Sequence, residues 1–379
     1  MKIIKISLDS LQIPFVERFR HTRKDRSFSD TVIVRVETDT GVVGYGEGLP
    51  RPYVTGETVS SLMDHVSNVL WPMIAQKEID TEDIFDAVHQ LLPVEKAPST
   101  HIVHNAARCA VELAVIDAAL KSKESGLHDV LSPTVKALQY SGVITSGSAQ
   151  SVYKRASQYK RIGLSHIKLK VGTKNSEALV AAAREALGER AILRLDANSA
   201  WTLSEAIAML NKLEQYDIAS CEEPLAARKW KDLRTLREAT TIPLMADESL
   251  VTLADAQSLV RHKSVDLFNI RISKCGGIGP SLRIANCARE HGLDYQIGAH
   301  VGETAILSAV GRQLAAHLGD VRFLEGSYGT LLLTEDISRT SIRFGHKGVG
   351  KPIRGLGLGM KIVEEKIHRY SVQHMERYE

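Results

Sequence analysis

Eight short apolar segments, separated by helical segments, limit more than any other feature how this 379-residue chain can fold. They begin at about residue 137, and an amphipathic pattern of helical period follows each of the first seven. The predicted strands are 138–144, 166–171, 191–196, 218–223, 242–247, 265–271, 293–298 and 321–326. Eight such repeats predict the α/β class and a TIM-type (β/α) barrel. An open doubly wound sheet would need a glycine-rich phosphate turn after its first strand, and SGVITSGS is not one.

The first third of the chain has a different pattern, which predicts an α+β capping domain. Strands are expected at 2–8, at 31–37 and through 42–45, after which Gly44, Gly46 and Gly48 open a loop, and helices at 57–76, 81–91 and 101–121. The last helix is apolar on almost every side, so we expect it to be buried between two bodies. The predicted domains are 1–130 (the cap), 131–335 (the catalytic barrel) and 336–379, a C-terminal segment that packs back on the cap.

Composition excludes several classes of protein. A formal net charge of +3 argues against a dedicated nucleic-acid binder, and no apolar run is long enough to span a membrane. The N-terminus lacks the pattern of a signal peptide, and the four cysteines stand singly. We therefore expect a cytoplasmic protein with free thiols.

Three successive predicted strands end in a carboxylate, and barrel enzymes carry their chemistry at these strand ends. The residues are Asp196, Glu222 and Asp247, separated by 26 and 25 residues. Each step is one β/α unit, so the carboxylates should emerge side by side and repel one another unless a cation lies between them. Ligands that are all oxygen favour Mg²⁺, with Mn²⁺ as a substitute. The alternative is that they are ordinary acidic surface residues.

Two lysines end the strand before these carboxylates. Lys168 and Lys170 are two residues apart, so both point to the same face of the strand. Facing outward they would lie under the helix layer, where a buried lysine is costly. Facing inward they would adjoin the metal and lower each other's pKa, which suits a general base. The alternative is that they lie at an exposed loop end.

This combination resembles the enolase superfamily and, within it, the muconate-lactonizing-enzyme subgroup, which includes enzymes similar to mandelate racemase and muconate cycloisomerase. The segments that carry the resemblance are IKLKVG, LDANSAW, EEPL, ADES, NIRISKCGG and GEGLPRPYVTGET. The resemblance implies that Asp196, Glu222 and Asp247 bind Mg²⁺, which holds a substrate carboxylate and stabilises an enediolate intermediate. It further implies that Lys170 is the base and Lys168 its electrostatic companion. Asn198, Glu223 and Glu248 would orient the ligands, or be ordinary polar residues.

The sixth predicted strand departs from the pattern of the family. Lactonizing-type members have a lysine where this chain has Arg271, and arginine is always protonated, so it cannot be a base. Lys274 is a poor substitute, because it should face the other way or lie in a loop. His300 follows the seventh strand, where some members have a catalytic histidine, but the aspartate that assists it would fall at Arg271. Glu303 matches a family glutamate, and Glu325 ends the eighth strand.

These residues favour one-base chemistry on a small carboxylic acid. The leading hypothesis is a cycloisomerase-like isomerase, and the first alternative is an acid-sugar or hydroxy-acid dehydratase. An amino-acid or dipeptide epimerase is less favoured because of Arg271, and a non-catalytic protein on the same scaffold stays open. The basic segment 16–26, with Arg20 and Arg26, suits a dianionic substrate if it closes over the site. By analogy we also expect a homo-oligomer.

Overall fold

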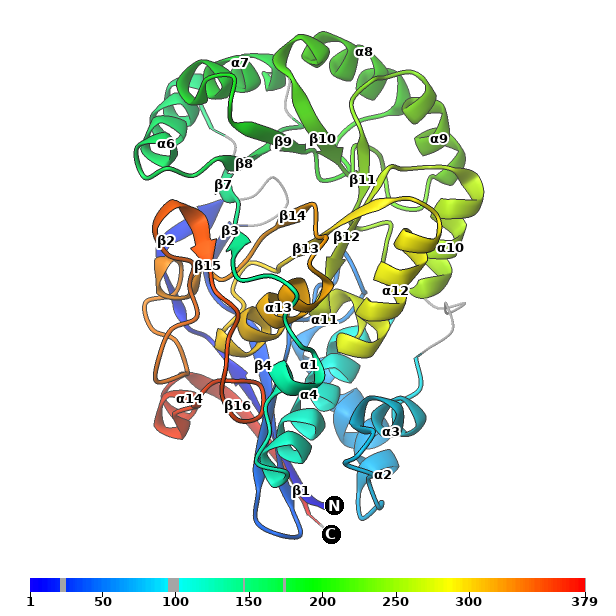
Figure 1. Ribbon diagram of the computed structural model, residues 1–379, viewed down its shortest axis with the longest axis vertical. Coiled ribbons are helices and arrows are strands. Elements are labelled where there is room, and N and C mark those ends of the chain that lie inside the picture. The colour runs from blue at the N-terminus through cyan, green and yellow to red at the C-terminus, as the bar shows by residue number, and fades with distance from the viewer. Residues whose placement is uncertain (21–24, 95–101, 146, 173–174, 379) are drawn as a thin grey trace.

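The computed structural model describes residues 1–379 except 21–24, 95–101, 146, 173–174 and 379. A barrel and a cap make up the molecule, with the barrel in the upper half of Figure 1 and the cap in the lower half. Among the described residues no helix has the length and apolarity needed to cross a lipid bilayer. All four cysteines are free and buried, as the sequence predicted.

Eight parallel strands form the barrel sheet, and consecutive strands pair in chain order from β7 to β14. They are β7 (Gly142–Ile144), β8 (His166–Lys170), β9 (Ile192–Asp196), β10 (Ile218–Glu222), β11 (Leu244–Ala246), β12 (Leu267–Arg271), β13 (Asp294–Gly298) and β14 (Phe323–Leu324). The backbone N–H of Ser141 donates to the carbonyl of Leu324 at 2.9 Å, which joins the last strand to the start of the first. The TIM-type barrel is therefore confirmed.

Helices follow the strands and surround the sheet, and several of them form the outer arc of Figure 1. They are α6 (Ala149–Arg161), α7 (Ser176–Leu187), α8 (Leu203–Leu213), α9 (Trp230–Glu238), α10 (Leu253–His262), α11 (Ile272–Cys275), α12 (Ile278–Glu290) and α13 (Ala305–Leu318), with the 3₁₀ segments η2 (Glu214–Tyr216) and η3 (Gly329–Leu331). Threonine side chains begin two of the predicted helices: Thr202 caps α8 and Thr252 caps α10, each in a capping box.

The cap is a four-stranded antiparallel sheet in the order β16-β1-β4-β5, covered by helices. Its strands are β1 (Ile3–Leu11), β4 (Thr31–Thr38), β5 (Val43–Gly48) and β16 (Ser371–Tyr378). Its helical segments are α1 (Val59–His65), η1 (Val66–Leu70), α2 (Trp71–Ile74), α3 (Ile84–Leu91) and α4 (Asn105–Ser122). The register pairs Lys5 with Tyr378, so the C-terminal strand β16 completes the cap sheet.

The remaining elements connect these two parts. A short hairpin, β2 (Pro14–Arg20) and β3 (Asp25–Phe28), projects from the cap toward the barrel. The others are α5 (Leu127–Val130), β6 (Leu138–Gln139), η4 (His346–Gly348), β15 (Val349–Gly350) and α14 (Glu364–Tyr370). The predicted strand 138–144 is thus divided, because β6 pairs with β15 rather than with the barrel.

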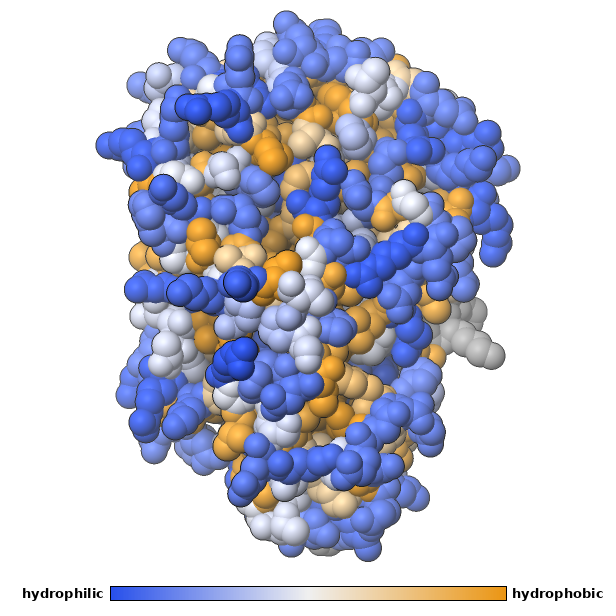
Figure 2. Space-filling model, in the orientation of Figure 1, coloured by the Kyte–Doolittle hydropathy of each residue, from blue (hydrophilic) through white to orange (hydrophobic). Residues whose placement is uncertain are grey.

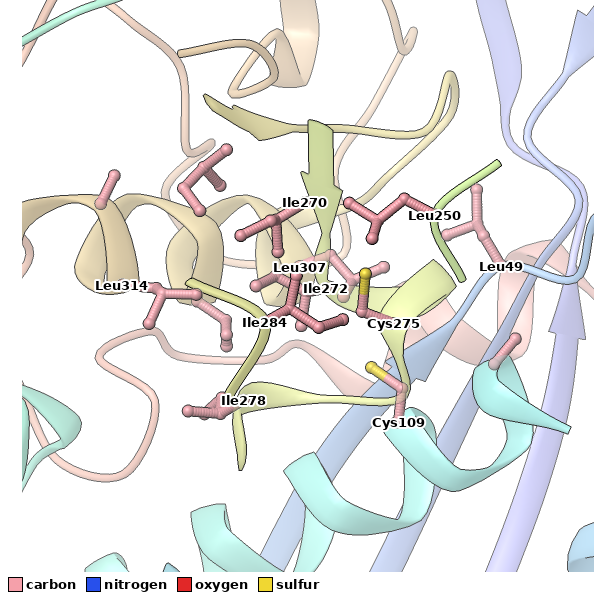
Figure 3. Packing of buried hydrophobic residues seen from close by; sticks show 14 of the residues in the cluster. Leu49, Cys109, Leu250, Ile270, Ile272, Cys275, Ile278, Ile284, Leu307 and Leu314 are labelled. Carbon is pink, nitrogen blue, oxygen red and sulfur yellow. The ribbon is translucent and has the colours of Figure 1, made fainter. Parts of the chain in front are cut away.

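Helix α4 is buried between the cap sheet and the barrel, as its apolar surface predicted. Figure 3 shows side chains from α4 and from the barrel helices meeting there, among them Cys109, Cys275 and Ile278. On the face in Figure 2, hydrophilic residues dominate the periphery and hydrophobic residues show mainly toward the middle. The two domains therefore share one continuous core.

The three glycines expected to open a loop lie instead within β5, so that prediction is wrong. Alternate residues of a strand share one face, and this face lies directly on α4. A Cβ on Gly46 would lie 1.9 Å from the carbonyl oxygen of Ala110, and one on Gly44 would lie 2.1 Å from that of Ala114. The glycines are needed for this close approach, not for a turn.

We expect Gly46→Ala to destabilise the protein by at least about 3 kcal/mol, because the clash is with backbone that cannot move aside. Thermal unfolding should show a clearly lower Tm. Gly311→Ala in α13 is the matched control, since its Cβ would have only an ordinary contact at 3.8 Å. An unchanged Tm for Gly46→Ala would contradict the packing of β5 on α4.

Candidate active site

Three buried carboxylates lie at the C-terminal ends of adjacent strands. Asp196 ends β9, Glu222 ends β10 and Asp247 directly follows β11; each is 1% exposed. The parallel register places Asp196 opposite Glu222, and Lys170 of β8 opposite Asp196. The sequence-predicted residues of three consecutive β/α units thus come together in space.

The two lysines of β8 point inward, toward these carboxylates. The Nζ of Lys168 lies 3.0 Å from Asp196 Oδ2 and 2.8 Å from Glu222 Oε2. The Nζ of Lys170 lies 3.1 Å from Asp196 Oδ2 and donates to Asn198 Oδ1 at 2.9 Å. Lys170 is the more accessible of the two and lines the pocket described below.

Arg271 reaches the carboxylates from the opposite side of the barrel. Its Nη2 lies 3.3 Å from Glu222 Oε1 and also donates to Asp247 Oδ2. Three strands separate β8 from β12 in either direction around the barrel, so Lys170 and Arg271 face each other across its mouth. Lys274, fully buried in α11, donates to the carboxylate of Asp247 at 2.8 Å and to its carbonyl at 2.7 Å. It anchors that residue and does not enter the pocket.

Polar residues beside the carboxylates fix the loops that follow the strands. Glu223 is fully buried, and its carboxylate accepts from the N–H groups of Asp247 at 2.7 Å and Ser249 at 3.1 Å. Both Asn198 and Glu223 have left-handed backbone conformations, with φ of 46° and 39°. Such conformations are costly for these residues and tend to occur where a functional side chain must be held in place.

Three further predicted residues face the pocket near Arg271. His300 is 4% exposed, and neither of its ring nitrogens has a hydrogen-bond partner among the described residues. Glu303 accepts from the His300 N–H at 2.6 Å, and Glu248 has one unpartnered buried oxygen within the same part of the structure. Unpartnered buried polar atoms around a cavity are the groups that a bound ligand or metal ion would satisfy.

A polar layer deeper in the barrel was missed by sequence reasoning. Arg194 is 1% exposed and donates to Ser141 Oγ at 2.9 Å, to Glu325 Oε1 at 3.0 Å and to Gln296. Asn269 donates to Glu222 Oε1 at 2.9 Å. A signal was present, because Arg194 is two residues before Asp196 and Asn269 is two before Arg271, so each pair shares the inward face.

These residues surround a pocket of about 700 Å³. The predicted residues that line it are Lys168, Lys170, Asp196, Asn198, Glu248, Arg271, His300, Glu303 and Glu325. Its outer part is lined by residues that the sequence did not single out, including Val16, Tyr53, Lys154, Gln158 and Leu331. They lie in a hairpin, a loop, a helix and a 3₁₀ turn, so no strand-end rule could find them.

The basic segment 16–26 contributes less to the pocket than its charges suggested. Arg26 donates to Asp30 at 2.7 Å and does not line the cavity, and the side chain of Arg20 is outside the described part of the chain. Buried Arg51 also donates to Asp30, and it reaches the carbonyl of Val301 at 2.8 Å. Arg51 thereby ties the cap to the barrel loop that carries His300.

The donor set fits a hard cation such as Mg²⁺, because three buried carboxylates supply only oxygen atoms. They converge, since Lys168 bridges Asp196 and Glu222 while Arg271 bridges Glu222 and Asp247. In the described part of the chain, no three acidic, histidine or cysteine side chains already form a metal cluster. A divalent ion at this position would replace the ion pairs that these cationic side chains now make.

The buried charges shift one another's titration. Burial alone would lower the pKa of Lys168, but Asp196, Glu222 and Glu325 outweigh it and hold that pKa above its ordinary value. Burial raises the pKa of Glu303 to about 8, and burial with nearby Arg271 holds the pKa of His300 well below its usual range.

Comparison with known proteins shows the family to which this chain belongs. Residues 8–132 match the family model described as the mandelate racemase / muconate lactonizing enzyme N-terminal domain, and residues 151–366 match the enolase C-terminal domain-like model. A hydrophobic dipeptide epimerase of Enterococcus faecalis is 30% identical over 84% of this chain and 87% of its own. Muconate cycloisomerase 1-2 of Acinetobacter lwoffii is 27% identical over 97% and 95%.

A solved structure shows the same similarity. The dipeptide epimerase of Cytophaga hutchinsonii, complexed with Mg and the dipeptide D-Ala-L-Val, superposes with a TM-score of 0.88 at 25% identity, covering 99% of this chain and 100% of the other. Together the two family models cover most of the chain, from the cap through the barrel. The chain belongs to the enolase superfamily, as a member of its mandelate racemase / muconate lactonizing enzyme family.

Proposed function

We propose that this enzyme removes a proton from the carbon next to a substrate carboxylate, with Lys170 as its single base. One observation carries the proposal. Lys170 reaches the pocket from β8, and the group that faces it from β12 is the guanidinium of Arg271. Because a guanidinium stays protonated, proton transfer is confined to the Lys170 face of the substrate.

Asp196, Glu222 and Asp247 would hold Mg²⁺, in agreement with the Mg found in the related epimerase complex. Bound there, the ion would supply positive charge beside the substrate carboxylate and so stabilise the charge that develops when the α-proton leaves. Lys168 would add a second positive charge, and Asn198 would hold the Lys170 ammonium by its hydrogen bond of 2.9 Å. Arg271 can neutralise the enolate or bind a second carboxylate through its planar fork.

A cycloisomerase-like reaction suits this arrangement best. In the lactone-forming direction, one carboxylate oxygen adds to a carbon–carbon double bond conjugated to the other carboxylate. A C–O bond forms, the double-bond electrons move to the α-carbon, and the ammonium of Lys170 donates the proton that the α-carbon takes up. The reverse reaction returns that proton to Lys170 and breaks the C–O bond. Every proton transfer occurs on the face of the substrate that Lys170 contacts.

Dehydration is a second candidate, and His300 favours it. Loss of water from an α-proton and a β-hydroxyl requires a hydrogen-bond donor for the departing oxygen. The His300 imidazole is buried against the pocket and has no partner among the described residues, so it is available for that contact. The acid would be a hydroxy acid or an acid sugar.

Epimerisation is the activity in the names of several relatives, including the Enterococcus faecalis and Cytophaga hutchinsonii proteins compared above. Inversion at a carbon needs a base on one face and an acid on the other that can exchange roles. Arg271 cannot exchange roles at neutral pH, so this alternative ranks third.

The stereochemistry with which the α-proton exchanges for deuterium tests the proposal. We expect the Mg²⁺-supplemented enzyme in D₂O to place deuterium at the α-carbon of an N-acylated amino acid without inverting its configuration. Arg271→Lys should introduce a second titratable group and yield inverted, deuterated product, whereas Arg234→Lys on the surface of α9 should not. NMR measures the deuterium incorporated at the α-carbon, and chiral chromatography measures the inverted product. Rapid racemisation by the unaltered enzyme would contradict one-base chemistry and favour the epimerase.

A further inference from the structure

One face of helix α6 forms the outer wall of the pocket. Ser151, Lys154, Arg155 and Gln158 all line the cavity. Their spacing of three, four and seven residues places them on a single side of the helix. The helix is held against the barrel by Tyr159, whose hydroxyl donates to the carbonyl of Val143 at 2.9 Å. This face of α6 is therefore a fixed part of the pocket lining.

Among the described residues, this face of α6 carries one cation that no acidic side chain neutralises. Arg155 pairs with Glu17 of the β2 hairpin at 3.3 Å, which cancels both charges. Lys154 makes no ion pair within the described part of the chain, and the Gln158 amide there has no hydrogen-bond partner either. The pocket thus presents a net positive charge and a free amide at its outer end.

Apolar side chains line the same pocket as this cation. Val16, Tyr53 and Leu331 line the pocket although they are 57%, 39% and 49% exposed. They come from three separate segments: the β2 hairpin, the loop after β5, and η3. Exposed apolar side chains that gather around a cavity from unrelated segments indicate the path of a ligand.

We propose that the outer part of the pocket is a second binding site, in which Lys154 and Gln158 bind an anionic group at the far end of an extended, apolar-bodied substrate acid. This rests on the proposed function, since the first carboxylate of that acid occupies the inner site beside Lys170. The substrate class is then a dianion whose two charges are separated by an apolar chain.

The volume of the cavity agrees with such a ligand. About 700 Å³ is within the range of pockets that enclose molecules much larger than a four-carbon acid. A short diacid would fill only the inner site, so the contribution of Lys154 should depend on the length of the chain.

Binding of matched acids to the Mg²⁺-supplemented full-length protein tests the proposal. The probes are α,ω-dicarboxylates of four to ten carbons, each compared with the monocarboxylate of equal length by calorimetry. We expect succinate and butyrate to bind with equal affinity. Each longer diacid should bind about tenfold more tightly than the monoacid of equal length, which is the usual contribution of a hydrogen bond to a charged group. Raising the salt concentration should reduce that preference.

Variants of α6 identify the residue responsible. Lys154→Gln should reduce the preference for long diacids to about twofold or less and leave binding of the monoacids unchanged, and Lys154→Arg should restore it. Lys160→Gln, an exposed lysine of α6 that does not line the pocket, is the matched control. Equal weakening of both series by Lys154→Gln, or binding of neither series, would overturn the proposal.

The same titrations separate this proposal from the proposed function. Lys170→Met should abolish proton exchange yet retain the preference for long diacids, because binding requires no turnover. A preference that depends on Lys154 while exchange persists in Lys170→Met would refute Lys170 as the base and leave the outer site intact. If Lys170→Met loses proton exchange and no preference for long diacids is found, only the outer site is refuted.

Discussion

Replacing Lys170 with methionine should lower the rate of α-proton exchange by about 10²–10⁴-fold, the usual contribution of a general base. Methionine matches the lysine side chain as far as Cε but lacks the nitrogen that accepts the proton. The loss should appear in kcat, because the substitution leaves the rest of the pocket lining unchanged. Exchange measured by NMR in D₂O checks the result.

Lys170→Arg distinguishes a base from a fixed positive charge. Arginine preserves the charge beside Asp196 but cannot accept a proton, so the account predicts a loss as large as that in Lys170→Met. Lys136→Met, at an exposed position, controls for general effects of the substitution. Near-normal exchange by Lys170→Arg would mean that the lysine acts only through its charge.

Removal of divalent metal should abolish exchange, and Mg²⁺ or Mn²⁺ should restore it. Asp247→Asn should weaken metal binding, measured by calorimetry with Mg²⁺, because it removes one of the three carboxylate charges that the ion needs. It should also lower the Tm of the metal-free protein, since partly buried Arg271 and fully buried Lys274 both pair with this carboxylate. Breaking a buried ion pair from one side costs about 3–5 kcal/mol.

Asp64→Asn, on the exposed side of α1, is the matched control for that experiment and should change neither the Tm nor the affinity for Mg²⁺. The two effects of Asp247→Asn can be separated, because one is measured with the metal and one without it. An Asp247→Asn protein that binds Mg²⁺ as tightly as the original would remove this residue from the metal site.

Much of the inner site could be predicted because a barrel places its functional groups by a simple rule. Polar residues at the C-terminal ends of parallel strands converge, so Asp196, Glu222 and Asp247 were recognisable one β/α unit apart. The same rule placed Lys170 and Arg271 at the mouth. Alternation within a strand could also have revealed Arg194, which shares the inward face of Asp196.

Other features depend on contacts between distant segments, which local patterns do not record. Gly46 resembles a turn residue in sequence, and only the approach of Ala110 from α4 explains why it lies in a strand. Lys154 resembles any solvated lysine on a helix until the β2 hairpin and η3 enclose the pocket around it. The surroundings of Lys168 depend on distant segments in the same way, because its three carboxylate neighbours lie at the ends of three other strands.

A crystal structure of the protein grown with Mn²⁺ would test the central claim most directly. We expect one anomalous peak bound by Asp196, Glu222 and Asp247, with the Arg271 contacts to the last two released and the Lys170 nitrogen facing the open side of the ion. A peak elsewhere, or no peak while Arg271 still bridges Glu222 and Asp247, would contradict it.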